Sequence, residues 1–151
     1  GTIAATGIVD EDKLEKILED PYFTLKYPKS LDRFDFSYKL VGGMSLEDGA
    51  ATLTALVAAA VSKSLDMLPI RPIQLIVSGG GRKNTTMMRE IATRGNIEVK
   101  TADNYDWRGD AIEAECFAFL AARSLANLPI SYPKTTGVLK PLTGGVIAYP
   151  E

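Results

Sequence analysis

The sequence predicts an α/β fold in which helices flank a few-stranded sheet. The first observation is an apolar, β-branched run at Ile73–Val77, which is typical of a buried strand. The second is the pattern after this run, which predicts a helix over Asn84–Thr93 and then another strand at Ile97–Thr101. A strand, a helix and a strand in succession favour parallel pairing within a layered fold. A last short strand is expected at Val146–Tyr149.

The first helix is predicted in "VDEDKLEKILEDP", where Leu14, Ile17 and Leu18 share one face and Pro21 ends the pattern. Residues 22–40 are rich in aromatic and basic side chains and have no regular period. Such interleaving occurs in proteins that bind nucleic acid, but the net charge of -2 opposes that interpretation. We therefore expect a long loop whose aromatic rings pack on the body of the protein, and no nucleic-acid partner.

Two longer helices are predicted on either side of the strands. The first, Leu46–Leu65, lies in "MSLEDGAATLTALVAAAVSKSLDML". Ser45 is a natural N-cap, and Glu47 and Asp48 meet the positive end of the helix dipole. The middle of this helix is apolar nearly all round, which indicates that it is covered on several sides. The second helix is predicted over Arg108–Asn127.

The composition is that of a globular protein and excludes several kinds of chemistry. The 151 residues are expected to form a single domain, 1–151.

The absence of histidine removes Ser-His-Asp and Cys-His catalysis and most zinc sites. One cysteine, Cys116, allows no internal disulfide and fits a reducing, cytoplasmic location. The longest apolar run, residues 55–61, is too short to cross a bilayer, and no signal peptide is visible, so no membrane association is expected.

Three consecutive glycines, Gly79, Gly80 and Gly81, lie between the first strand and the helix after it. The dinucleotide-binding pattern G-x-G-x-x-G fails, because its third glycine falls on Asn84. A P-loop fails as well, because no Gly-Lys pair occurs. Two interpretations remain open. The glycines form a tight turn that needs φ > 0, or they leave the backbone bare for a nucleotide, with Asn84 capping the next helix.

A second candidate lies in "RGDAIEAECFAFLAARSL". On a helix, Glu113 shares one face with Cys116, Phe117 and Leu120. A carboxylate at the end of an apolar stripe lies at the mouth of a site or is held by donors, because burying it unpaired is costly. Cys116 is expected to be a small buried hydrophobic residue rather than a nucleophile, and Asp110 is expected to cap the helix.

Five segments occur in an order and spacing that resemble the C-terminal part of the anhydro-N-acetylmuramic acid kinases. They are "PYFTLKYPKS", "SLEDGAATLTAL", "VSGGGRKNTTMM", "GDAIEAECFAFLAAR" and "TGVLKPLTGGVIAYP", and together they cover almost the whole chain. The resemblance implies the sugar-kinase, actin and heat-shock ATPase superfamily. The expected fold is therefore a partial ribonuclease-H-like (actin-like ATPase) lobe, with a few-stranded mixed sheet and flanking helices. Members of the family use ATP to open the 1,6-anhydro ring and phosphorylate the sugar during peptidoglycan recycling.

The resemblance also implies roles for particular residues. Gly79, Gly80 and Gly81, with Asn84, match a turn that lies under the adenosine of ATP, and Glu113 matches a carboxylate near the sugar. ATP and Mg²⁺ are the cofactors expected in the complete enzyme, and 1,6-anhydro-N-acetylmuramic acid is the expected small-molecule partner. No catalytic residue and no metal ligand is expected within this chain.

The chain also departs from the family pattern. The phosphate loop G-x-M-S-G-T-S-x-D-G and the segment F-D-T-G-P-G-N, with its catalytic aspartate, do not occur in these 151 residues. "PKSLDRF" stands where P-K-S-T-G-R-E is expected, so no role is assigned to it. We expect the chain alone to be inactive and to form a homodimer through an unpaired sheet edge. The alternative is a non-catalytic nucleotide-binding or protein-interaction module of related α/β fold.

Overall fold

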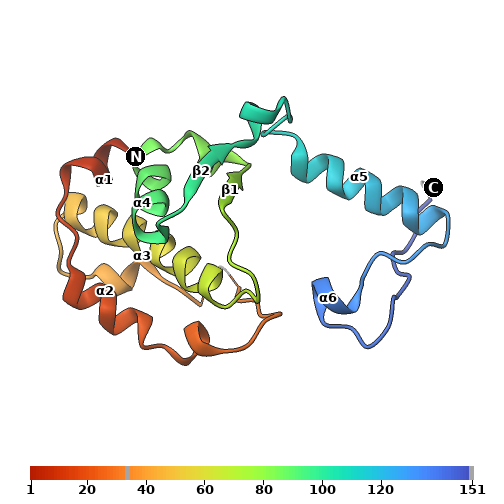
Figure 1. The fold of residues 1–151 in the computed structure, drawn as a ribbon, viewed down its shortest axis with the longest axis horizontal. Coiled ribbons are helices and arrows are strands. Elements are labelled where there is room, and N and C mark those ends of the chain that lie inside the picture. The colour runs from red at the N-terminus through yellow and green to blue at the C-terminus, as the bar shows by residue number, and fades with distance from the viewer. Residues whose placement is uncertain (33–34, 150–151) are drawn as a thin grey trace. The chain divides into compact units, whose positions relative to one another are not determined.

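The structure is a computed structural model that describes residues 1–32 and 35–149 (Figure 1). The chain forms two compact units, Gly1–Gly109 and Asp110–Glu151. The helices and strands of the first unit are, in chain order, α1 (Thr2–Thr6), α2 (Glu11–Leu18), α3 (Leu46–Asp66), β1 (Gln74–Val77), α4 (Thr85–Gly95) and β2 (Glu98–Thr101). Its 3-10 turns are η1 (Pro21–Thr24), η2 (Tyr38–Val41), η3 (Gly80–Lys83) and η4 (Ala102–Tyr105). The predicted α/β class is confirmed.

The sheet of the first unit is a parallel pair, β1 and β2, connected through α4. The register aligns Gln74 with Glu98 and Val77 with Thr101, so both strands end at the same edge of the sheet. Each strand begins one residue later than predicted. The expectation that Ile73–Val77 is buried is wrong, because no residue of β1 is buried and Ile73 is 92% exposed. Within the described ranges this is a sheet of two parallel strands, so the mixed pairing that was expected is not present there.

Helix α3 forms the centre of the first unit, with α1, α2 and α4 packed around it (Figure 1). The hydroxyl of Ser45 caps it by accepting from the N–H of Asp48 at 3.0 Å, as predicted. Small residues such as Ala55 and Ala58 are fully buried, which lets neighbouring helices approach closely. Thr52 is also fully buried, and its hydroxyl accepts from the N–H of Asp10 at 3.0 Å, so burial leaves that oxygen with a partner.

The main apolar cluster joins α2, the region after it and α3. It contains Leu14, Phe23, Ala55, Leu56 and Ala59. The rings of Tyr22 and Phe36 pack beside Phe23, each with its centroid 5.6 Å from that of Phe23. The prediction that the aromatic residues of 22–40 pack on the body of the protein is therefore confirmed for these rings. Residues 33 and 34, within that predicted loop, lie outside the described residues.

The second unit contains α5 (Ile112–Leu125), α6 (Pro133–Thr136) and an extended tail. The strand predicted at Val146–Tyr149 is wrong, because these residues take no regular structure. In the described part of the tail, β pairing is limited to an isolated antiparallel bridge between Ser131 and Leu142. A strand needs the edge of another strand to pair with, and β propensity alone does not supply one. Instead, Val146 and Ile147 help to line an apolar cavity against α5.

Two smaller expectations for this unit are also wrong. Helix α5 begins at Ile112 rather than near Arg108, and its N-cap is Ala111 rather than Asp110. Cys116 is exposed rather than buried. Among the described residues, no helix is both long enough and apolar enough to cross a membrane.

Candidate functional site

The glycine turn Gly79–Gly81 lies at the end of β1, where the chain leaves the sheet and enters η3. Gly79 has φ 73° and ψ -176°. Residues with a Cβ rarely adopt this backbone conformation, because it is sterically unfavourable for them, whereas glycine adopts it freely. The tight-turn interpretation is therefore correct for Gly79.

The two glycines after Gly79 are in different surroundings. A Cβ added to Gly81 would lie 2.7 Å from the methyl carbon Cε of Met87, a flexible group. A Cβ added to Gly80 would meet nothing within 4 Å, and Gly80 has no positive φ. Packing among the described residues thus gives no reason for glycine at position 80. The backbone of Gly80 therefore borders open space.

Asn84 is the N-cap of α4, as predicted. Its side-chain Oδ1 accepts from the N–H of Met87 at 3.0 Å. In the same turn of α4, the hydroxyl of Thr86 donates to the backbone oxygen of Gly1 at 3.0 Å. The capping bond fixes where α4 begins, and so fixes the direction of its first N–H groups beside the glycine turn.

Arg82, which directly follows the glycines, is a site residue that the sequence analysis missed. It is only 8% exposed. Its Nε and Nη2 donate to the two carboxylate oxygens of Asp103, at 2.6 and 3.2 Å, and its Nη1 donates to the carbonyl oxygen of Gly79 at 2.9 Å. Asp103 lies in η4, just after β2. The sequence did contain a signal for this pair. Arg82 and Asp103 have opposite charges, and each follows one of the two parallel strands. The carboxyl ends of parallel strands meet at one edge of the sheet.

Glu113, the predicted sugar-contacting residue, lies in the first turn of α5. Its side chain is exposed, and Phe117, one turn further on, is 64% exposed. The structure thus places the four turn residues together in the first unit and Glu113 in the second. Nearby in the second unit, Phe117 and Leu120 line the apolar cavity of about 480 Å³ that the tail also borders.

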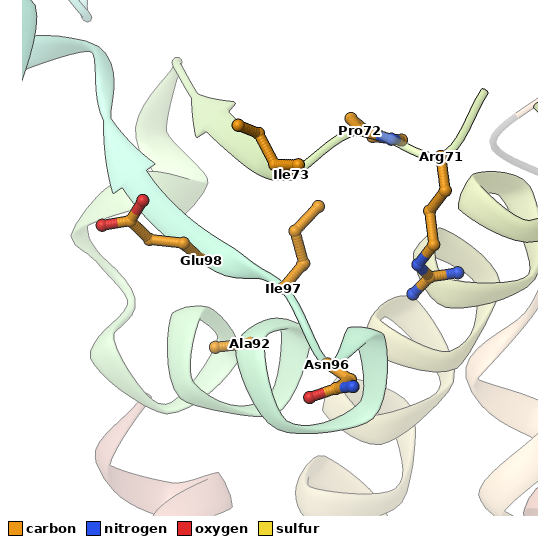
Figure 2. A pocket seen from close by; sticks show the side chains of 7 residues that line it. All are labelled: Arg71, Pro72, Ile73, Ala92, Asn96, Ile97 and Glu98. Carbon is orange, nitrogen blue, oxygen red and sulfur yellow. The ribbon is translucent and has the colours of Figure 1, made fainter.

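A larger cavity, of about 510 Å³, lies at the amino ends of the strands (Figure 2). Figure 2 shows Ile73 and Ile97 on its two sides, with Arg71 reaching toward the end of α4. Arg71 bonds to Asp66 and to the carbonyl oxygen of Gly95, and Glu98 bonds to Gln74 and Lys100. Lys100, then Gln74, hold the pKa of Glu98 below its ordinary value. Both charged residues of this cavity thus have protein partners, and the glycine turn lies at the opposite ends of the strands.

Histidine, cysteine and carboxylate side chains do not cluster in the part of the chain that the structure describes. No group of three or more His, Cys, Asp or Glu side chains within residues 1–32 and 35–149 is placed to hold a metal ion. No chemical step is therefore assigned to a metal ion on the described residues.

The sequence matches one protein family along nearly its whole length. The family model described as anhydro-N-acetylmuramic acid kinase matches residues 1–150. A protein of Mesorhizobium japonicum that bears the same name is 55% identical over 148 residues, which are 98% of this chain and 40% of the relative. One from Brucella anthropi is 57% identical over 145 residues, 96% of this chain and 39% of the relative. The chain spans about 40% of the length of the curated relatives it matches.

Proposed function

Because the chain belongs to the anhydro-N-acetylmuramic acid kinase family, we propose that it forms the C-terminal, ATP- and sugar-contacting portion of an ATP-dependent 1,6-anhydro-N-acetylmuramate kinase. The family match over residues 1–150 supports an enzyme rather than a non-catalytic module. Both units would belong to one actin-like lobe, and the parallel β1–α4–β2 arrangement is compatible with it. The single cysteine agrees with a cytoplasmic location.

In this proposal the glycine turn positions ATP and Glu113 contacts the sugar. ATP supplies the phosphoryl group when it is bound. Phosphoryl transfer depends mainly on positioning and on charge stabilisation. Gly80 leaves the backbone accessible to the adenosine, and the cap at Asn84 orients the start of α4. These residues contribute neither a phosphate loop nor a base, so we expect the 151-residue chain alone to be inactive.

The observation that carries this proposal is the open space at Gly80. In a full-length kinase that carries this sequence, Gly80→Val should raise the KM for ATP by about tenfold or more, because the branched side chain occupies the space proposed for adenosine. Folding stability should change by less than about 1 kcal/mol. Steady-state kinetics with varied ATP, together with thermal unfolding, measure the two effects.

Gly80→Ala is the matched control for this experiment. It removes the same backbone freedom but adds a single methyl group, so the KM for ATP should change less than in Gly80→Val. If the Gly80→Val enzyme folds and its ATP affinity is unchanged, the proposal is contradicted, and the three glycines form a structural turn only.

A further inference from the structure

Hydrogen bonds hold both the N–H and the carbonyl oxygen of Gly79. Its N–H donates to the carbonyl oxygen of Gly109 at 2.9 Å. Its carbonyl oxygen accepts from the N–H of Arg82 at 3.3 Å and from Nη1 of the same arginine at 2.9 Å. A residue in a sparsely populated conformation persists only where its surroundings determine it fully. For Gly79, those surroundings are Gly109 and Arg82.

The guanidinium of Arg82 also links the ends of the two strands. It is held by both oxygens of Asp103, which follows β2, while it bonds to Gly79, which follows β1. Gly109 packs directly on this group, since a Cβ added there would lie 2.4 Å from Nε of Arg82. One side chain therefore fixes the glycine turn relative to β2 and to the segment that ends at Gly109.

From this geometry we propose that Arg82 is a positioning residue for the nucleotide. It holds Gly79 in its positive-φ conformation, and thereby keeps the backbone of Gly80 in the position proposed for the contact with adenosine. This inference rests on the proposed function of the glycine turn. Arg82 itself points into the protein, toward Asp103, and acts on the nucleotide only through the turn.

Positioning the glycine turn requires the planar guanidinium group of an arginine. A lysine carries a positive charge but no planar set of donors, so it cannot bond to both oxygens of Asp103 and to Gly79 at the same time. Substitution by lysine should therefore keep the charge and loosen the turn. The turn should loosen in the same way if Arg82 is kept but its guanidinium is displaced. Gly109→Ala should displace it, because the added methyl group would lie against Nε of Arg82.

The test compares Arg82→Lys, Gly109→Ala and the unchanged sequence in a full-length kinase that carries this chain. We expect each substitution to raise the KM for ATP by about tenfold, as the loss of a charged hydrogen bond that positions the site predicts. The KM for the anhydro sugar, and kcat at saturating ATP, should change by less than about twofold. Titration with ADP, followed by calorimetry, measures nucleotide affinity without turnover.

Arg94→Lys is the matched control. Arg94 also forms a bidentate pair with a carboxylate, donating to the two oxygens of Glu11 at 2.6 and 3.1 Å. This pair joins α2 to α4, away from the glycine turn. Its substitution should lower the melting temperature and leave the KM for ATP unchanged. The comparison separates a general loss of stability from a specific loss of nucleotide affinity.

The outcomes distinguish this inference from the proposed function. If Gly80→Val weakens ATP binding while Arg82→Lys and Gly109→Ala do not, the role of Arg82 is overturned and the nucleotide site stands. If the two substitutions raise the KM for both substrates alike, Arg82 is a general structural residue and the inference also fails. If Gly80→Val leaves ATP affinity unchanged, the site itself has been misplaced, and the inference about Arg82 falls with it.

Discussion

Gly79 and Gly80 are neighbours, yet the fold of the described residues requires only the first to be glycine. Gly79 has a positive φ that disfavours any side chain. Gly80 has neither a positive φ nor a neighbour that a Cβ would touch. The described structure thus requires glycine at position 79 and gives no packing reason for it at position 80. In the proposed function, contact with the nucleotide would be the reason for glycine at position 80.

Glu113 gives a prediction at the same scale. In a full-length kinase that carries this sequence, Glu113→Gln should lower kcat/KM for the anhydro sugar by about tenfold or more, because a charged hydrogen bond to the substrate is lost. The KM for ATP should stay within about twofold, since the proposed adenosine contact is made by the glycine turn. Initial rates with each substrate varied in turn measure both effects.

Glu115 provides the control for Glu113. It lies in the same first turn of α5, so Glu115→Gln removes a similar interaction with the helix dipole. It should cost at most about 1 kcal/mol of stability and leave the kinetics unchanged. If Glu113→Gln behaves in the same way, with full activity, Glu113 is a peripheral acid of α5.

At the scale of elements, the helix starts follow a local rule. Asp10, Ser45 and Asn84 each accept a hydrogen bond from the N–H three residues further on, and each begins a helix of the first unit. Helix α5 has no such cap, because its N-cap residue is Ala111, which makes no side-chain capping bond. Its predicted start was therefore the least accurate of the long helices.

The contact between α2 and α4 gives a pH-dependent prediction. Arg94 donates to Glu11 and to Glu90, and the hydrogen bond from Arg94 holds the pKa of Glu11 below its ordinary value of 4.5. A lowered pKa means that the carboxylate stabilises the fold at pH values above about 4.5 and loses this effect as the pH falls through the lowered pKa. Glu11→Gln should therefore cost about 0.2–1 kcal/mol at pH 7, because the pair is partly exposed.

Urea unfolding of the 151-residue chain at pH 7 and at pH 3 measures this difference. The cost of Glu11→Gln should be smaller at pH 3 than at pH 7. Glu15→Gln, at an exposed position of the same helix, should change stability by less than about 0.5 kcal/mol. An equal cost for Glu11→Gln at both pH values would show that the ion pair with Arg94 does not stabilise the fold.

For the whole molecule, the distribution of apolar side chains bears on association. Among residues 110–149 of the described chain, no side chain is buried. Several large apolar side chains of that unit are exposed, namely Phe117, Phe119, Leu125, Leu139, Val146 and Tyr149. In the first unit, Ile73 beside β1 is 92% exposed. Exposed apolar surface and open strand edges favour association.

We therefore predict that the 151-residue chain forms a homodimer in solution. Light scattering should give twice the mass of 16.3 kDa, and Ile73→Lys should shift the population toward monomer if the edge of β1 takes part. Lys63→Arg, a conservative change on α3, is the control and should leave the mass unchanged. A monodisperse, stable monomer of the unchanged chain would contradict the prediction.

Features that depend on nearby residues could be predicted from the order of amino acids. The caps at Ser45 and Asn84, the buried face of α2 with Leu14, and the two strands around the glycine turn were all predicted to within a few residues. Each follows from local hydrogen bonding or from the period of apolar residues along the chain. The positive φ at Gly79 was likewise among the interpretations that the glycine run left open.

Features that depend on distant partners are visible only in the folded chain. The bond between Arg82 and Asp103 joins residues 21 positions apart in sequence, and no local pattern reports that two strand ends meet. The tail at Val146–Tyr149 has strand-like residues but forms no strand, because pairing needs the edge of another strand. Cys116 lies on an apolar helix face and is still exposed, because burial depends on what covers that face. Local rules act through neighbouring residues, whereas pairing and burial are decided by which distant segments meet.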